Sequence, residues 1–457
     1  MARLSTMAVY RGTAALIWGL AIWHCWVARG LFIDGSAILV TMIKNGGFAL
    51  FFDSRRYVMA LTQMPVASAI EVGVTDTQTL SRLLSVGLFF APTAFYHACL
   101  FRARRDPALL AAVVCAIAVV FLPTSFFVVG EYNSVGAAVL FAGLVLVTGT
   151  RSSVGDGVLL GATAALLMRS YETMVCYGPL LAMLTVWRMA ITGRRGIASV
   201  FYLLAVMLFL ASVAVSVQSL LNPMNPLHFA NESSQVLQFW RNLQFTLPLS
   251  ALVVVVVAGL AAPALLESRR LYLGAGVLLL LLAACPLLWL TDGTVRPFAR
   301  THYHARTMGG VVIAAIVVAI WLYGLRPSWA PRALSALAQP PIARRFLAFQ
   351  VVALLAALPA DILLTNLWWR SLAEFQSTIS QRSGFIPLEE TSLGRLPYSD
   401  MTEQWTLPSE SLVIRRKSSD GIVLPPRGYA DFQPFDATRQ LPYDADKYLW
   451  GGQGRIQ

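Results

Sequence analysis

Eleven long apolar segments constrain the fold of this chain more than any other feature of its sequence. A helix needs about 20 apolar residues to cross the hydrocarbon core of a bilayer, and the segments approach that length. Only 13% of the 457 residues are charged, whereas soluble proteins carry about 25%. We therefore expect an all-α polytopic membrane protein with about eleven transmembrane helices, near residues 12–30, 82–101, 107–123, 134–149, 157–169, 173–190, 198–220, 244–265, 271–290, 308–325 and 346–366.

Basic residues are concentrated in the short loops between these segments. The net charge of +12 is spread over every second loop instead of forming one stripe. This favours the positive-inside pattern of membrane proteins over nucleic-acid binding. We therefore expect the N-terminus in the cytoplasm and, after an odd number of helices, the C-terminus on the outer face.

The two longest segments on the predicted outer side differ in character. Residues 31–81 contain apolar patches too short to span a membrane, and we expect interfacial helices there. Residues 367–457 are rich in proline and charge and contain no spanning run. The sequence thus predicts two domains, a transmembrane domain (1–366) and a small extracytoplasmic domain (367–457). Within the second, SLVIRRKSSDGIVLPP (411–426) is typical of strand, turn and strand, which predicts an α/β or β-containing domain.

Two predicted helices, 157–168 and 173–187, are short for a span and bracket a polar tip from Arg169 to Glu172. We expect this tip to be recessed below the outer surface, where an arginine–glutamate pair requires a polar cavity. Two interpretations stay open. Arg169 and Glu172 neutralise each other, or they take part in binding within that cavity.

The first acid after the first predicted helix is Asp34, in the run RGLFIDGS. An aspartate at a helix start can cap the free backbone N–H groups, and DGSAIL fits that function. The alternative is a general base or a metal-associated carboxylate at the membrane surface. The next polar run, FFDSRRY, favours this alternative because it adds Asp53, Arg55 and Arg56 on the same side.

The order of an apolar helix, RGLFIDGS, a spacer and FFDSRRYVMALTQMP resembles the start of the GT-C class of membrane glycosyltransferases. That class includes protein O-mannosyltransferases and the aminoarabinose transferases that modify lipid A. The resemblance covers about residues 12–82 and implies that Asp34 is the catalytic acid, with Asp53 as a candidate second carboxylate. Gly35 stands where a second acidic residue often follows in the class, which leaves a divalent cation such as Mg²⁺ or Mn²⁺ an open alternative.

The same resemblance implies a sugar donor carried on polyprenyl phosphate, delivered within the membrane. The acceptor is a glycan, a lipid or a protein on the outer face. It also implies a multi-pass protein of the bacterial inner membrane, with the C-terminal domain in the periplasm.

Basic residues on the predicted outer side suit the phosphate of such a carrier, because a guanidinium group contacts phosphate in a bidentate manner. RPFARTHYHARTM (296–308) is the densest group and opposes the positive-inside trend, so we expect an anionic partner for it. The alternatives are lipid headgroups or salt bridges to the acidic tail. Candidates for phosphate binding are Arg55, Arg56, Arg169, Arg300, His302, His304 and Arg306, and candidates for the acceptor site or a second acid are Glu131 and Glu172.

The sequence predicts no metal site, since no CxxC spacing occurs and His302 and His304 lack helical ligand spacing. It predicts an enzyme, an inverting glycosyltransferase that uses a polyprenyl-phosphate sugar. Two alternatives stay open. One is an O-antigen polymerase or ligase, which usually relies on a large late loop, whereas the largest internal loop here comes first. The other is a non-enzymatic transporter of lipids or glycolipids, against which the lack of internal repeats counts.

Overall fold

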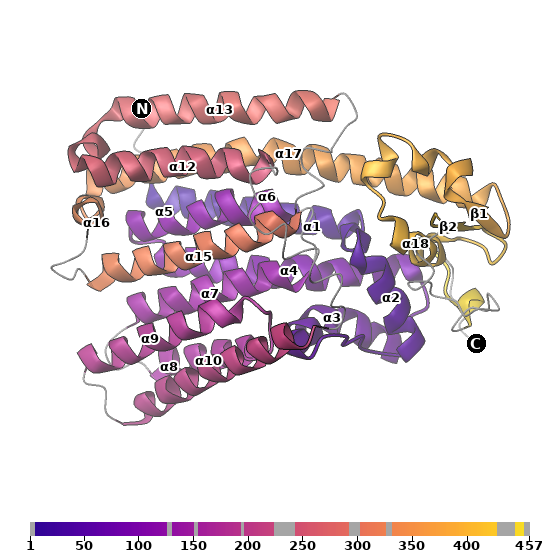
Figure 1. Cartoon of the computed structure of the whole chain (residues 1–457), viewed down its shortest axis with the longest axis horizontal. Coiled ribbons are helices and arrows are strands. Elements are labelled where there is room, and N and C mark those ends of the chain that lie inside the picture. Colours follow the sequence, from indigo (N-terminus) through magenta and orange to yellow (C-terminus); the bar gives the residue numbers. More distant parts are fainter. Residues whose placement is uncertain are drawn as a thin grey trace.

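The structure is a bundle of long helices with a further segment at one end, which we call the C-terminal segment (residues 381–426 and 444–451; Figure 1). This computed structural model describes residues 5–125, 130–149, 154–192, 196–223, 243–291, 302–325, 331–426 and 444–451. The long helices are α1 (Thr6–Trp26), α4 (Thr77–Ala103), α5 (Pro107–Ala116), α7 (Glu131–Thr148), α8 (Val154–Leu167), α9 (Met174–Thr192), α10 (Ile197–Leu221), α12 (Leu243–Ala261), α13 (Arg269–Thr291), α15 (His302–Leu325) and α17 (Pro340–Ser380). A π-helical turn, Ile117–Phe121, joins α5 to α6 (Leu122–Ser125).

All eleven predicted segments fall on helices. Within the described residues, seven helical stretches are both long and apolar enough to cross a membrane: Thr77–Ala103, Pro107–Ser125, Glu131–Thr148, Met174–Ile191, Ile197–Leu221, Arg306–Leu325 and Pro340–Ser380. The helix α8 and the Phe245–Ala261 part of α12 are apolar but shorter. The chain is therefore a multi-pass membrane protein by length and composition of its helices, while the number of eleven spans stays a prediction.

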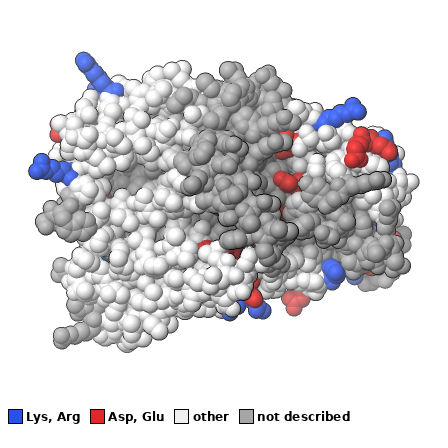
Figure 2. Space-filling model, viewed as in Figure 1, with Lys and Arg blue, Asp and Glu red and all other residues white. Residues whose placement is uncertain are grey.

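The surface of the bundle carries large apolar side chains of the kind that lipid would cover. Along α10, Val200, Leu203 and Met207 are each more than half exposed. Contiguous apolar surface of this kind is unusual on soluble proteins. On the face drawn in Figure 2, the described charged residues lie at the left edge and from the middle to the right end, and the surface between these two regions is largely free of them. Both observations agree with helices that cross a bilayer along the long axis of the molecule.

The first long predicted loop is helical in two places, as expected. The short helices are α2 (Asp34–Asn45) and α3 (Arg56–Glu71), preceded by the 3-10 turns η1 (Arg29–Leu31) and η2 (Asp53–Arg55). Helix α3 packs closely on α4, where an added Cβ on Gly87 would lie 1.6 Å from the carbonyl oxygen of Thr62. The glycine therefore permits this backbone approach, which holds the loop against the bundle.

The C-terminal segment contains less β-structure than the sequence predicted. The expected strand over residues 411–416 is wrong, because Leu407–Ile414 forms the helix α18. Pro408 lies in the first turn of α18, where a missing backbone N–H costs nothing. The apolar residues of α18 are buried. The second expected strand is present as β2 (Ile422–Leu424), which pairs in parallel with β1 (Phe385–Pro387) instead of forming a hairpin.

The C-terminal segment shares a hydrophobic core with the membrane helices. Helix α17 continues without a break through the predicted boundary at residue 366 and ends at Ser380. Leu39 of α2, Trp368 of α17 and Leu412 of α18 belong to one cluster of buried residues. The hydroxyl of Thr77, at the start of α4, donates a 2.5 Å hydrogen bond to the carbonyl of Val413. These contacts fix the segment directly beside α2 and the start of α4.

The predicted loops separate onto two ends of the bundle. At one end, Arg102 donates to Asp156 at 2.6 Å, and Arg188 donates to the carbonyl of Gly149 at 2.8 Å, which links the arginine-rich loops. Residues 31–81, the start of α7 and the C-terminal segment occupy the opposite end (Figure 1). This division matches the alternation read from the sequence, and which end faces the cytoplasm stays a prediction.

Candidate functional site

Asp34 is exposed at the very start of α2, beside the C-terminal segment. The residue in the N-cap position is Ile33, so Asp34 is not the cap that one interpretation of the sequence expected. Ile33 has a φ of 56° and a ψ of −117°, a conformation that β-branched residues rarely adopt. Such strain persists only where surrounding contacts impose it. The fold therefore holds a turn that sets Asp34 at the surface.

Close backbone packing explains the glycine that follows this aspartate. A Cβ on Gly35 would lie 1.6 Å from the carbonyl oxygen of Gly30. Gly30 in turn lies against α4, and its N–H donates a 2.9 Å hydrogen bond to the hydroxyl of Ser85. Since these obstacles are largely backbone, no side chain fits at position 35 without moving α2. A second acid directly after Asp34 is thus sterically excluded.

Arg55 and Glu172 form a fixed ion pair at the same end. The Nε of Arg55 lies 3.0 Å from both carboxylate oxygens of Glu172, and the hydroxyl of Ser54 donates to the same carboxylate at 2.8 Å. The Arg55 guanidinium also stacks over the rings of Phe52 and Tyr171. Burial of Glu172 favours its neutral form, but the charge of Arg55 and these hydrogen bonds outweigh burial and lower its pKa. Glu172 is therefore held as a carboxylate.

The pairing expected from the sequence is different from the one observed. Glu172 binds Arg55 instead of Arg169. The Nη1 of Arg169 lies 4.0 Å from a carboxylate oxygen of Asp53, and Arg56 lies at the same distance from that oxygen. Asp53 is almost fully exposed, with 89% of its side chain accessible. Two guanidinium groups thus share one solvated carboxylate at this edge of the site.

Glu131 and Arg306 lie deeper in the same region. Glu131 is buried at the first residue of α7, and the charges of Arg55, Asp34 and Arg306 all act on its carboxyl group. Arg306, in the first turn and a half of α15, donates to the hydroxyl of Tyr171. We call Asp34, Arg55, Glu131, Glu172 and Arg306 the carboxylate–arginine cluster. The fold brings these five residues, which were candidates in the sequence analysis, to one region from five separate parts of the sequence; their functions stay predictions.

Three of the predicted phosphate binders cannot be placed in this cluster. Arg300 lies outside the described residues. His302 and His304 begin α15, but their side chains are also outside the described part of the chain. Among the described residues, no group of three or more His, Cys, Asp or Glu side chains is placed to hold a metal ion.

Two tyrosines that the sequence analysis did not single out hold Arg306 in place. Tyr132 donates a hydrogen bond to the Arg306 carbonyl, and its ring meets that of Tyr171 edge to face with centroids 5.7 Å apart. Arg306 lies near the faces of both rings, at 5.9 and 5.7 Å from their centroids. Tyr132 directly follows Glu131 and Tyr171 directly precedes Glu172, so adjacency to charged residues was the only indication available from the sequence.

The C-terminal segment adds a further acid, Glu403, that the sequence analysis missed. The residue precedes η9 (Gln404–Thr406), a turn that packs against α2. Burial, and secondly the negative charge of Asp34, raise the pKa of Glu403 to about 7. The pair of acids is separated by 369 positions in the sequence, and nothing in the local pattern of residues 401–406 indicates an approach to Asp34.

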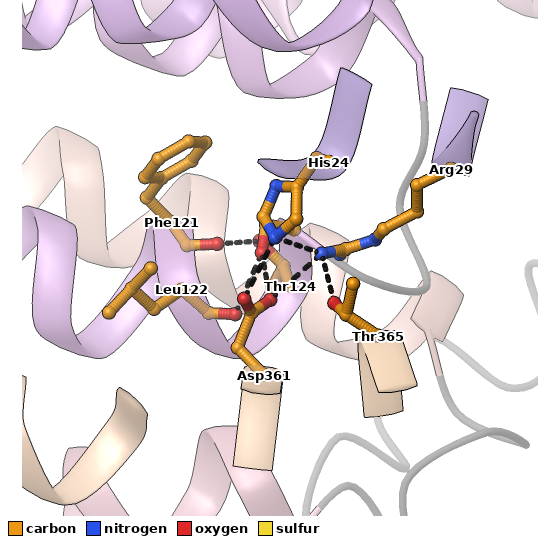
Figure 3. A network of polar contacts seen from close by, with 8 residues as sticks. His24, Arg29, Phe121, Leu122, Thr124, Asp361 and Thr365 are labelled. Carbon is orange, nitrogen blue, oxygen red and sulfur yellow. Dashed lines mark hydrogen bonds and ion pairs between the residues drawn. The ribbon is translucent and has the colours of Figure 1, made fainter. Parts of the chain in front are cut away.

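A second group of charges is buried around Arg29, the first residue of the turn η1 that precedes α2 (Figure 3). The Nη1 of Arg29 lies 2.6 Å from Nε2 of His24 and donates to Asp361 at 3.1 Å and to Thr365 at 3.0 Å. His24 Nε2 is also 3.0 Å from Asp361, and Ser125 donates to the same carboxylate at 3.1 Å. We call His24, Arg29 and Asp361 the buried triad.

The buried triad joins α1, η1 and α17. Close by, the indole N–H of Trp368 donates to the carbonyl of Val27 at 3.1 Å, and its ring meets Phe32 edge to face. These contacts fix both ends of η1, the turn that leads to Asp34. The sequence analysis placed none of the three residues of the buried triad among the candidate site residues.

Comparison of the chain with protein families, with curated proteins and with solved structures found no match. The function must therefore be argued from the site itself.

Proposed function

We propose that the protein is an inverting glycosyltransferase that moves a sugar from a polyprenyl-phosphate donor to a glycan, lipid or protein acceptor. The observation that carries this proposal is the position of Asp34. It is exposed, it lies at a helix start, and its charge acts on Glu131, whose carboxyl group also feels the charges of Arg55 and Arg306 at the same end of the helix bundle. A carboxylate and several guanidinium groups at the end of membrane helices suit a phosphate that arrives within the bilayer.

In this reaction Asp34 accepts the proton of the acceptor hydroxyl as that oxygen attacks the anomeric carbon of the sugar. The bond from this carbon to the phosphate oxygen breaks on the opposite face, so the configuration inverts and the carrier phosphate leaves with the electron pair. Negative charge accumulates on the departing phosphate, and guanidinium groups stabilise it there.

The arginines at this end of the bundle differ in how closely a protein carboxylate already pairs with them, and hence in their availability to a phosphate. Arg55 is committed to Glu172, whereas the carboxylate that Arg56 and Arg169 approach among the described residues is the solvated Asp53, at 4.0 Å. Arg56 and Arg169 are therefore the first candidates for the carrier phosphate. In this proposal Arg55 and Glu172 form the rigid support behind them.

The proposal places the protein in the bacterial inner membrane with the carboxylate–arginine cluster and the C-terminal segment on the periplasmic side. The arginine-rich end, with Arg102, Arg104 and Arg188, then faces the cytoplasm, as the positive-inside pattern requires.

The test is a strain that lacks the chain, complemented with the wild type, with Asp34→Asn or with Glu71→Gln. Mass spectrometry of surface glycans and lipids is expected to show one sugar missing in the deletion. Loss of a general base typically reduces rate by about 10²–10⁴-fold, so Asp34→Asn is expected not to restore the sugar at equal amounts in the membrane. Glu71, an exposed acid at the end of α3, is the matched control and is expected to restore it.

A transporter is the second candidate, and the buried triad is the observation that favours it. Ionisable residues within membrane segments often mark transport pathways. If transport is the function, exchange of Asp361 abolishes movement of substrate, whereas Asp34→Asn leaves it intact. Restoration of the missing sugar by Asp34→Asn would contradict the transferase proposal.

A further inference from the structure

A cavity of about 620 Å³ lies at the arginine-rich end of the bundle, away from the carboxylate–arginine cluster. It opens between the last turns of α4, the end of α7 and the side of α8. Helix α4 has 27 residues, so its two ends are about 40 Å apart. The cavity therefore has no part in the proposed transfer reaction.

One wall of the cavity is apolar and continues onto the outer surface of the helices. Ala98, Phe101, Phe141 and Leu159 line this wall. Phe101 and Leu159 are both more than two-fifths exposed, so the wall extends toward the region that acyl chains would occupy. A small hydrophilic ion gains nothing from such a surface.

The cavity lining also contains two arginines at the end of α4, and they are in different electrostatic states. Arg102 is neutralised, since it donates to Asp156 at 2.6 Å and to the hydroxyl of Thr148 at 3.2 Å. Arg104 binds the carbonyl of Phe101 and stacks on its ring, with the guanidinium carbon 3.4 Å from the centroid. Among the described residues, no carboxylate lies within ion-pair distance of Arg104. The lining thus holds one positive charge that protein groups position without neutralising.

The remaining polar side chain, His97, is fixed by its neighbours. Trp18 can only donate a hydrogen bond, so Nδ1 of His97 accepts it at 2.9 Å. Its Nε2 lies 3.2 Å from the hydroxyl of Tyr10. His97 therefore forms a rigid part of the lining, and Arg104 is the group left to recognise a ligand.

We propose that this cavity binds an anionic phospholipid of the adjacent leaflet, with the phosphate on Arg104 and acyl chains along the apolar wall. Basic pockets between membrane helices bind lipid headgroups in this way. The ligand class follows from the combination of an apolar wall open to the helix surface and one fixed guanidinium charge that no carboxylate of the described residues pairs with.

The experiment measures retention of added lipid by the purified full-length protein with native mass spectrometry. Phosphatidylglycerol and phosphatidylcholine with identical chains are compared, and inorganic phosphate is added as a competitor. The wild type is expected to retain phosphatidylglycerol preferentially. Arg104→Gln is expected to reduce that retention by about tenfold, the loss of roughly one charge-assisted hydrogen bond.

Two further variants separate the lipid site from general effects. Arg105→Gln removes an exposed charge at the same helix end that does not line the cavity, and it is expected to behave as the wild type. Ala98→Phe fills the cavity while keeping Arg104, and it is expected to lose the lipid. Equal retention by the wild type, Arg104→Gln and Ala98→Phe overturns the proposal, as does displacement of the lipid by millimolar inorganic phosphate or equal retention of phosphatidylcholine.

Discussion

The buried triad and the carboxylate–arginine cluster lie at the same end of the bundle, but their charges are compensated in different ways. In the buried triad, Arg29 and Asp361 have no exposed side-chain surface, and His24 has 4%. In the cluster, Arg55 and Glu172 keep 21% and 17% of their side chains exposed, and the neighbouring Arg56 and Asp53 are 53% and 89% exposed. Charges that only protein groups surround serve to hold the fold. Charges that face solvent stay available to a ligand.

The largest effect on stability is expected where the buried triad loses its carboxylate. Asp361→Asn removes the carboxylate that pairs with the buried Arg29, and breaking a buried ion pair in this way typically costs about 3–5 kcal/mol. Thermal unfolding in detergent measures this change, and Asp53→Asn, which removes an exposed carboxylate, serves as the matched control. A loss no greater than that of the control would show that the triad is not structural.

The next effect concerns the turn that carries the cluster's aspartate. Gly35→Ala places a Cβ 1.6 Å from the Gly30 carbonyl unless α2 moves. We expect a loss of about 2–3 kcal/mol, comparable to overpacking of a core, together with reduced transfer activity. Gly12→Ala in α1, where nothing lies within 4 Å of the added atom, is the control. It is expected to stabilise by up to about 1 kcal/mol. Equal melting temperatures for the two variants would contradict this interpretation of Gly35.

An effect of similar size, which depends on pH, is expected for Glu403. Its pKa is raised from 4.5 to about 7 in the folded protein. Between these values the unfolded chain releases a proton that the folded chain retains, so this residue's contribution to stability falls as pH rises. Glu403→Gln should therefore raise the melting temperature above pH 7, by an amount equivalent to about 3 kcal/mol, and change nothing below pH 4.5.

Glu410 provides the control for the contribution of Asp34. Burial alone raises the pKa of Glu410 to about 8. In an Asp34→Asn background the pKa of Glu403 should fall, because one of its two causes is removed, whereas that of Glu410 should not change. Melting curves between pH 5 and 8 test this difference. If the effect of Glu403 on the melting temperature has the same pH dependence with and without Asp34→Asn, the charge of Asp34 does not act on Glu403. That result would contradict the contact between the C-terminal segment and the cluster.

The smallest effect on stability is expected for Asp34 itself. Its side chain is exposed, and changes at exposed sites are usually within about 0.5 kcal/mol. Asp34→Asn should thus have the same melting temperature as the wild type at pH 5, where Glu403 is mostly protonated. It should nevertheless lose transfer activity. A loss of several degrees at that pH would place Asp34 with the structural charges of the buried triad.

Periodicity and charge in the sequence located the helices well because each membrane helix is a continuous apolar run. They also indicated the members of the cluster as candidates, because all five lie in the polar gaps between these runs: Asp34, Arg55, Glu131, Glu172 and Arg306. The partners were harder to predict. The pairing of Glu172 with Arg55 depends on how η2 packs beside the loop after α8, and local sequence contains no information on that contact.

The errors in the C-terminal segment have a related cause. The run SLVI has the composition of a strand, yet it forms the end of α18 because its residues pack into a core that α2 and α17 supply. Tertiary packing overrides such local preferences. The approach of Glu403 to Asp34 arises from the same packing of the C-terminal segment on α2, so it could not be predicted from the sequence.

The unbroken helix α17 has a mechanical consequence. With 41 residues it is about 60 Å long, and it runs as one rod from the arginine-rich end through Asp361 and Trp368 into the C-terminal segment. Pro359 removes one backbone N–H within it, but the helix continues through this point to Ser380, so displacement along its axis passes from one end to the other. A displacement of the C-terminal segment along this axis is therefore expected to reach the turn before Asp34, through the bond of Trp368 to the Val27 carbonyl, and also the arginine-rich end of the bundle.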